Sequence, residues 1–160
     1  MRARSLFLLL LTAAIVSFCI DLRAQTKPNY SGEWTMVLDK SDFGPMPAPS
    51  AVVRTVTHTE PDIKVVTKQT TDQGETTTTL VLSTDEKPHT NTVQGNQMTS
   101  VAKWDGSAIT VKGTLSMQGV DITIDERWEL SDAGKTLTIT RKFATPDGDA
   151  ATKIVYTKTK

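Results

Sequence analysis

Short runs of residues with alternating side-chain character recur along the chain after residue 30, and turn-forming residues separate them every 10 to 15 residues. A period of two is typical of a β-strand with one buried face. After the first 24 residues, no window has apolar residues at the three- and four-residue spacing of an amphipathic helix. Threonine supplies 27 of the 160 residues and favours a pleated, half-solvated surface. The sequence therefore predicts an all-β fold.

The order and spacing of the segments predict how they pair. Short turns between successive strands make sequence neighbours antiparallel, which gives an up-and-down meander. Closure removes the exposed edges of such a sheet, so a barrel of eight to ten strands is favoured over an open sandwich. A two-residue turn at Asp105-Gly106 would place Ala102 opposite Ile109 and Ser100 opposite Val111. The predicted strands are residues 30–38, 51–59, 63–71, 76–84, 89–94, 97–104, 107–117, 120–130, 135–143 and 149–157.

The first of these segments contains Trp34 on one face with Gly32 and Met36. A tryptophan is too large for the solvent side of a thin sheet without a specific reason. We therefore predict that Trp34 closes one end of the barrel.

The first 24 residues have the character of a targeting segment. Arg2 and Arg4 precede an apolar run over residues 6–20, and Ala24 ends an imperfect small-residue cleavage site. The alternative is an uncleaved membrane anchor, but that would need about 20 apolar residues. The prediction is a signal peptide over 1–24 and one domain over 25–160, exported to the periplasm or the extracellular space, with no membrane span in the mature chain.

Charge and cysteine usage exclude several classes of function. The formal net charge is zero, which argues against nucleic acid as a partner. The single cysteine, Cys19, lies in the leader. A mature chain from residue 25 would therefore have no disulfide, no thiolate nucleophile and no cysteine metal ligand.

Several residues resemble those of a known superfamily. Gly32-Glu33-Trp34 on the first of ten meandering strands resembles the calycins, which comprise the lipocalins and the fatty-acid-binding proteins. The stretch from Trp34 to Phe43 resembles the opening of a fatty-acid-binding protein, and residues 151–156 resemble its last strand. The resemblance implies a lipocalin-like barrel that binds a small apolar or amphipathic molecule, similar to a bacterial group of small exported proteins.

The chain also departs from both branches of that superfamily. Fatty-acid-binding proteins have two lid helices after the first strand, whereas prolines at 45, 47 and 49 favour an extended, solvated loop here. Lipocalins have a helix after the barrel, and this sequence ends within three residues of its last predicted strand. In the fatty-acid-binding proteins an Arg and a Tyr two residues apart hold the ligand carboxylate. Ile154 stands at the Arg position, and only Tyr156 matches.

Glu126 and Arg141 interrupt the apolar faces of two consecutive predicted strands. If both faces point into the barrel, the two residues are directly opposite or diagonal neighbours and can form an ion pair. One interpretation is a polar anchor for a ligand headgroup. The other is a structural cross-strand pair at the barrel rim.

Large side chains on the inward faces admit two similar interpretations. Trp104, Trp128, Met98 and Met117 could line a ligand cavity, because methionine and aromatic side chains adapt to apolar guests. They could equally fill a solid core. The full set of candidate ligand-binding residues is Trp34, Met98, Trp104, Met117, Glu126, Trp128, Arg141 and Tyr156.

No metal site, cofactor or catalytic centre is predicted. His58, Glu60 and Asp62 alternate, but Pro61 favours a turn there and one histidine with two carboxylates is poor ligation for a metal. No serine-hydrolase, zinc-protease or phosphate-loop motif is present. The sequence favours a binding protein rather than an enzyme. The alternative is a packed barrel that acts as a structural or protein-interaction module in the cell envelope.

Overall fold

The computed structural model describes residues 27–146 and 148–160, so the predicted leader lies outside the described residues. Within the described part, no helix has the length and apolar character needed to cross a membrane. The strands are β1 (Gly32–Met36), β2 (Ala51–Thr59), β3 (Asp62–Thr71), β4 (Gly74–Ser83), β5 (His89–Val93), β6 (Asn96–Asp105), β7 (Ala108–Met117), β8 (Val120–Ser131), β9 (Thr136–Thr145) and β10 (Gly148–Lys158). Two 3-10 turns, η1 (Leu38–Lys40) and η2 (Asp132–Gly134), complete the regular structure of the described residues.

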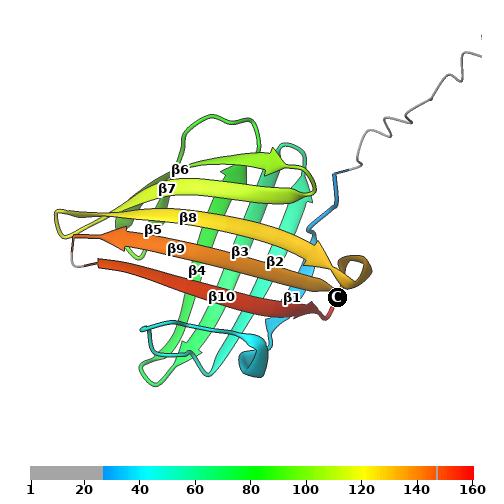
Figure 1. Cartoon of the computed structure of the whole chain (residues 1–160), viewed down its shortest axis with the longest axis horizontal. Helices are drawn as coiled ribbons and strands as arrows, with labels where there is room; N and C mark the ends of the chain where they lie inside the picture. Colours follow the sequence, from blue (N-terminus) through cyan, green and yellow to red (C-terminus); the bar gives the residue numbers. More distant parts are fainter. Residues whose placement is uncertain (1–26, 147) are drawn as a thin grey trace, which may run out of the picture.

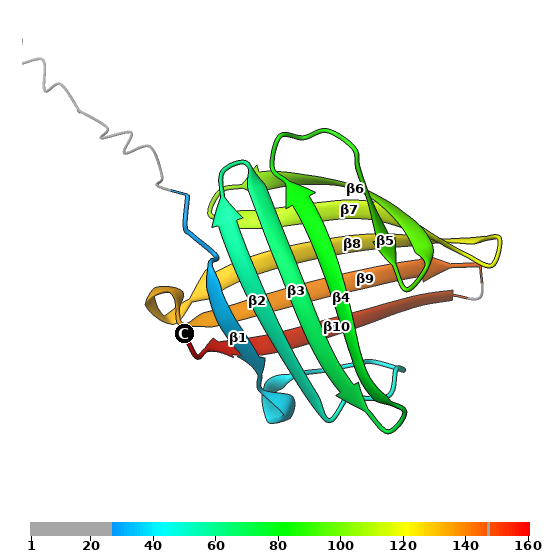
Figure 2. The ribbon, with the colours of Figure 1, turned by 180° about the vertical axis from the view of Figure 1, so that it is seen from behind.

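The ten strands form one antiparallel sheet in the order β4-β3-β2-β1-β10-β9-β8-β7-β6-β5. Every pair is a neighbour in sequence except β1 and β10, whose pairing joins the two halves of the meander. β6 to β10 run across the front of Figure 1, and β2 to β4 cross steeply behind them; Figure 2 shows the same two layers from behind. The predicted all-β meander and nearly closed barrel are confirmed.

The seam between β4 and β5 is held by a side chain. Among the described strands, no backbone ladder joins β4 to β5. Instead, Asn91 Oδ1 accepts a hydrogen bond from Val81 N at 2.7 Å, and Asn91 Nδ2 donates to Val81 O at 2.9 Å. The Asn91 side-chain amide thus makes the two hydrogen bonds with Val81 that the backbone of a paired strand would make.

The hairpin between β6 and β7 corrects one predicted register. Asp105 pairs with Ala108, so Gly106-Ser107 forms the turn, and Ala102 faces Val111 rather than Ile109. Gly106 has φ of 63°, a conformation that glycine adopts without a steric penalty. The predicted register is wrong by two residues. An even shift leaves the same side chains facing inward, so the predicted faces stand.

A dense core fills one end of the barrel. Trp34 and Tyr30 are fully buried, and the Trp34 indole donates to Tyr30 O at 3.0 Å. The Tyr30 hydroxyl donates to the carbonyl oxygens of Trp128 and Ser107 at 3.0 and 3.1 Å. Trp34 is buried as the prediction requires, and Tyr30 is a second residue that closes this end.

The segment between β1 and β2 contains no lid helix, as predicted from its prolines. It is bonded to β10 instead: Asp42 N donates to Lys153 O at 2.7 Å, and Lys153 N donates to Asp42 O at 2.8 Å. Ser41 Oγ accepts from Val155 N at 3.0 Å. The segment is mostly exposed, as predicted, but Pro49 is buried against the barrel. The chain therefore lies across one opening of the barrel, beside β10 in Figure 1.

Candidate functional site

A pocket of about 190 Å³ lies where this segment meets the barrel. We call it the mouth pocket. Its walls come from the proline-rich segment (residues 39–50, between β1 and β2), from the first half of β2 and the second half of β3, and from β9 and β10. The lining residues are Phe43, Met46, Pro47, Pro49, Val52, Arg54, Thr67, Gln69, Arg141, Phe143, Thr152, Ile154 and Tyr156.

Arg54 enters the pocket because of its position on β2. Val52, Val56 and His58 alternate with exposed residues and are buried, so residue 54 faces inward with them. The Arg54 guanidinium carbon lies 5.2 Å from the Tyr156 ring centroid and 5.8 Å from that of Trp128, both within cation–π range. Within the described residues, its buried Nε has no hydrogen-bond partner.

Glu126 and Arg141 form the predicted pair directly across β8 and β9. Arg141 Nε lies 2.5 Å from Glu126 Oε1. The approach is an ion pair rather than an aligned hydrogen bond, because the Nε–H finds no acceptor with suitable geometry among the described residues. The Trp128 indole donates to the other carboxylate oxygen, Oε2, at 2.7 Å. Glu126 is only 5% exposed and lies inside the barrel, whereas the Arg141 side chain is 27% exposed and reaches from Glu126 to the mouth pocket.

The electrostatics of this group favour a charged Glu126. Burial by itself raises the pKa of the carboxyl group, because a low-dielectric site penalises its charged form. The attraction of the Arg141 and Arg54 guanidinium groups and the hydrogen bond from the Trp128 indole act against burial, and the pKa of Glu126 is lowered overall. Glu126 is therefore an anion held between two cations.

The structure separates the predicted ligand-binding residues into groups. Arg141 and Tyr156 line the mouth pocket. Glu126 and Trp128 do not line it but contact its two arginines: Glu126 pairs with Arg141, and the Trp128 ring packs on Arg54. The other four do not line the pocket: Trp34 and Met98 are buried, Met117 ends β7, and Trp104 packs at the opposite end of β2.

Several pocket residues were not predicted. Arg54 carries the same sequence signal as Arg141, a charge within an apolar alternation between Val52 and Val56. Phe43 and Met46 reach the pocket only through the path of the proline-rich segment, for which the sequence carries no comparable signal.

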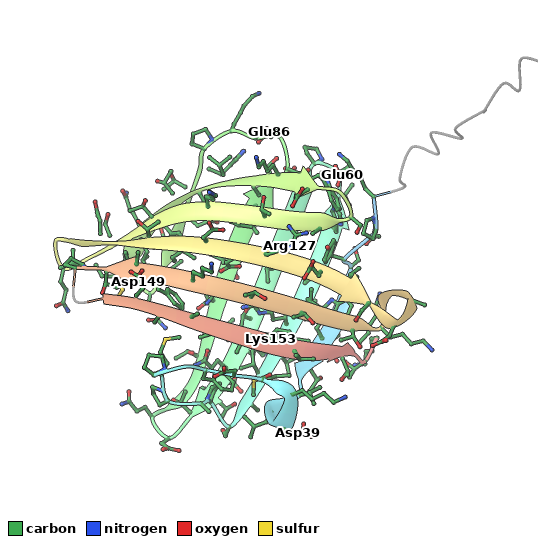
Figure 3. All side chains as sticks on the ribbon, in the orientation of Figure 1. Asp39, Glu60, Glu86, Arg127, Asp149 and Lys153 are labelled. Atoms are coloured by element: carbon green, nitrogen blue, oxygen red, sulfur yellow. The ribbon has the colours of Figure 1, made fainter. Side chains whose placement is uncertain are left out.

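A second polar cluster lies at the opposite end of β2, where Figure 3 labels Glu60. His58 is buried, and its Nε2 lies 2.8 Å from Glu60 Oε1. His58 Nδ1 accepts from Tyr30 N at 3.2 Å, and the Trp104 indole donates to Glu60 at 3.1 Å. Burial raises the pKa of Glu60, but the hydrogen bonds from His58 and Thr84, with nearby positive charge, lower it overall.

That cluster fastens the N-terminal segment to the barrel. Across the described chain, no group of three or more His, Cys, Asp or Glu residues could hold a metal ion. Asp62 pairs with Thr59 on the outer face of the sheet and does not join His58.

Comparisons with known proteins identify the fold. No family model and no curated protein matches the sequence. An abundant heat soluble (SAHS) protein of Ramazzottius varieornatus is 13% identical, with a TM-score of 0.61 over 84% of this chain and 98% of that one. Zebrafish ileal bile acid-binding protein, complexed with cholic acid, is 14% identical, with a TM-score of 0.54 over 81% and 98% of the two chains. The fold is that of the calycins.

Human cRBP IV is a further example of this fold, at 11% identity and a TM-score of 0.52 over 82% of this chain and 98% of that one. The predicted resemblance to the calycins is therefore confirmed at the level of the fold. In this chain, an extended proline-rich segment lies over the opening of the barrel, and Arg54 and Arg141 lie on the wall beneath it.

Proposed function

We propose that the protein is an exported, non-enzymatic binding protein that holds one small amphipathic molecule by its negatively charged end in the mouth pocket. The observation that carries this proposal is the charge balance of the pocket. Arg54 and Arg141 face a single carboxylate, Glu126, and the Nε of Arg54 is buried without a partner among the described residues. The Arg54 guanidinium forms no ion pair among the described residues, and an anionic ligand in the pocket would supply the partner that this charge lacks.

The rest of the pocket suits the apolar part of such a ligand. Phe43, Met46, Phe143 and Ile154 provide apolar contact, and methionine adapts to guests of different shape. The volume of about 190 Å³ is below the range of about 300–1,000 Å³ that is usual for drug-sized ligands. The pocket therefore suits a short molecule, or the head of a longer one whose tail extends past the proline-rich segment.

The calycin fold supports a binding role. Meandering barrels of this size commonly hold a small ligand inside. The zebrafish neighbour is a bile acid-binding protein in complex with cholic acid, and no enzyme is among the neighbours described above. Fold alone does not assign a ligand, so the class proposed here rests on the arginine pair. The location that we propose is the periplasm or the extracellular space, on the basis of the leader over residues 1–24.

One observation favours a second function, that of a structural or interaction module in the cell envelope. The end of the barrel around Trp34 and Tyr30 is packed solid, and the mouth pocket is small. A barrel that binds no small molecule would have no use for an unpaired Arg54, and this residue distinguishes the two proposals.

Uptake of an anionic fluorescent probe tests the proposed function. We expect anilinonaphthalene sulfonate to gain fluorescence with the protein, and octanoate to displace it. Arg54→Met should abolish this binding, whereas Lys68→Met, which removes the same charge from the outer face of β3, should retain it. Absence of binding to the wild-type protein, or equal binding to the two variants, would favour the packed module.

A further inference from the structure

The position of Glu126 has a consequence for the kind of anion that the pocket accepts. We propose that Glu126 is a specificity-determining residue that matches the mouth pocket to a ligand with a single negative charge. This inference rests on the proposed function and deepens it, because it concerns the charge of the ligand rather than its presence.

Glu126 is fixed at both of its oxygen atoms. Arg141 lies against Oε1 at 2.5 Å, and the Trp128 indole donates to Oε2 at 2.7 Å. Both contacts are inside the barrel, where Glu126 is 5% exposed. The carboxylate therefore stays in place as a permanent negative charge and compensates the charge of Arg141.

Arg54 provides the one positive charge that remains. Its guanidinium packs on the Tyr156 and Trp128 rings. Within the described chain, Arg54 forms no ion pair. Every other lining residue of the pocket, apart from Arg141, is uncharged. Arg54, Arg141 and the Glu126 carboxylate that contacts Arg141 together carry a net charge of +1.

This balance discriminates between ligands by charge. A neutral molecule leaves Arg54 unpaired, and a cation is repelled by it. A second negative charge has no free cation to meet and lies close to Glu126, in surroundings where charge repulsion is stronger than in water. One negative charge satisfies the site.

The experiment compares three ligands with the same eight-carbon chain: octanol, octanoate and octyl phosphate. At a pH of about 8, octyl phosphate carries nearly two negative charges, since its second pKa is about 6. We expect isothermal titration calorimetry to show that the wild-type protein binds octanoate most tightly. Glu126→Gln should improve the affinity for octyl phosphate relative to octanoate by about tenfold or more.

Two further variants make the result specific. Asp125→Asn removes the neighbouring carboxylate from the outer face of β8, where Asp125 meets Lys112, and should leave the ranking unchanged. The double variant Glu126→Leu with Arg141→Met removes the internal pair and leaves the net charge of the pocket at one. It should retain the wild-type preference for octanoate, and it decides the question if Glu126→Gln does not fold.

The outcomes separate this inference from the proposed function. Octanoate binding with the same ranking in wild type and Glu126→Gln would overturn charge selection by Glu126 and leave the proposed function standing. A double variant that prefers octyl phosphate would also overturn it. If the wild-type protein binds none of the three ligands, both the proposed function and this inference fail.

Discussion

Arg141 is the residue whose removal most directly tests the internal ion pair. Replacing it with methionine keeps most of the volume but leaves Glu126 without its closest cation. Breaking one side of a buried pair typically costs about 3 kcal/mol or more. We expect the free energy of unfolding in urea to fall by about this amount in Arg141→Met.

A double-mutant cycle provides the control. The double variant Glu126→Leu with Arg141→Met should recover most of the loss, because two well-packed apolar side chains can replace a buried pair at little net cost. Single variants that each change stability by less than about 1 kcal/mol would indicate a solvated pair and contradict the buried geometry.

The dependence of stability on pH is a second prediction at the residue scale. The pKa of Glu126 is lowered in the folded protein from its ordinary value of 4.5, so the unfolded chain takes up this proton first as the pH falls. The stabilisation from Glu126 is therefore fully present above about pH 4.5 and is lost as the pH falls through the lower folded pKa. The urea midpoint of wild type should fall more steeply than that of Glu126→Gln between pH 6 and 3. Parallel curves would show that Glu126 has equal proton affinity in both states.

For single residues, the sequence predicts which charged side chains face the inside of the barrel, but not which of them border a pocket. Glu126 and Arg141 stand out because they interrupt apolar alternation, and the structure brings them directly opposite each other. Arg54 carries the same signal on β2 and belongs to the same site. The alternation of apolar and polar residues does not show whether an inward side chain packs against other side chains or borders a pocket. Trp34 and Tyr156 both face inward, yet only Tyr156 lines the mouth pocket.

The element with the most distinctive construction is β5, which faces β4 through the Asn91 amide. Replacing Asn91 with alanine removes two hydrogen bonds, each with a typical net value of about 1 kcal/mol. We expect the Val81 amide to exchange with solvent faster and the free energy of unfolding to fall by about 1–2 kcal/mol. Thr92→Ala, an exposed neighbour on β5, is the matched control. Unchanged protection of Val81 in Asn91→Ala would show that another contact holds the seam.

Strand positions follow from local sequence far better than hairpin registers do. All ten predicted strands begin and end within two residues of the observed ones, because turn residues bound them on both sides. β1 is shorter than predicted by two residues at each end, because Tyr30 docks into the core and the chain turns at Leu38. The β6–β7 register differs from prediction because Asp105-Gly106 and Gly106-Ser107 are both acceptable turns, and either one preserves the buried face.

For the whole molecule, a closed meander is predicted from sequence because an open sheet would leave two exposed edges. The chain reaches closure in part through β1 and β10 and in part through a side chain at the seam, and only the first follows from strand order. The volume of the interior depends on the path of the proline-rich segment and on side-chain packing across the barrel, which are long-range properties. This is why the sequence left a binding barrel and a packed barrel as alternatives.

Native mass spectrometry of the protein purified from its host tests the binding role most directly. We predict that the protein carries one small acidic amphipathic molecule, and that Arg54→Met, purified in the same way, is free of it. A wild-type protein that has only the mass of its own polypeptide, and that takes up neither octanoate nor an anionic fluorescent probe, would contradict a binding function for the mouth pocket.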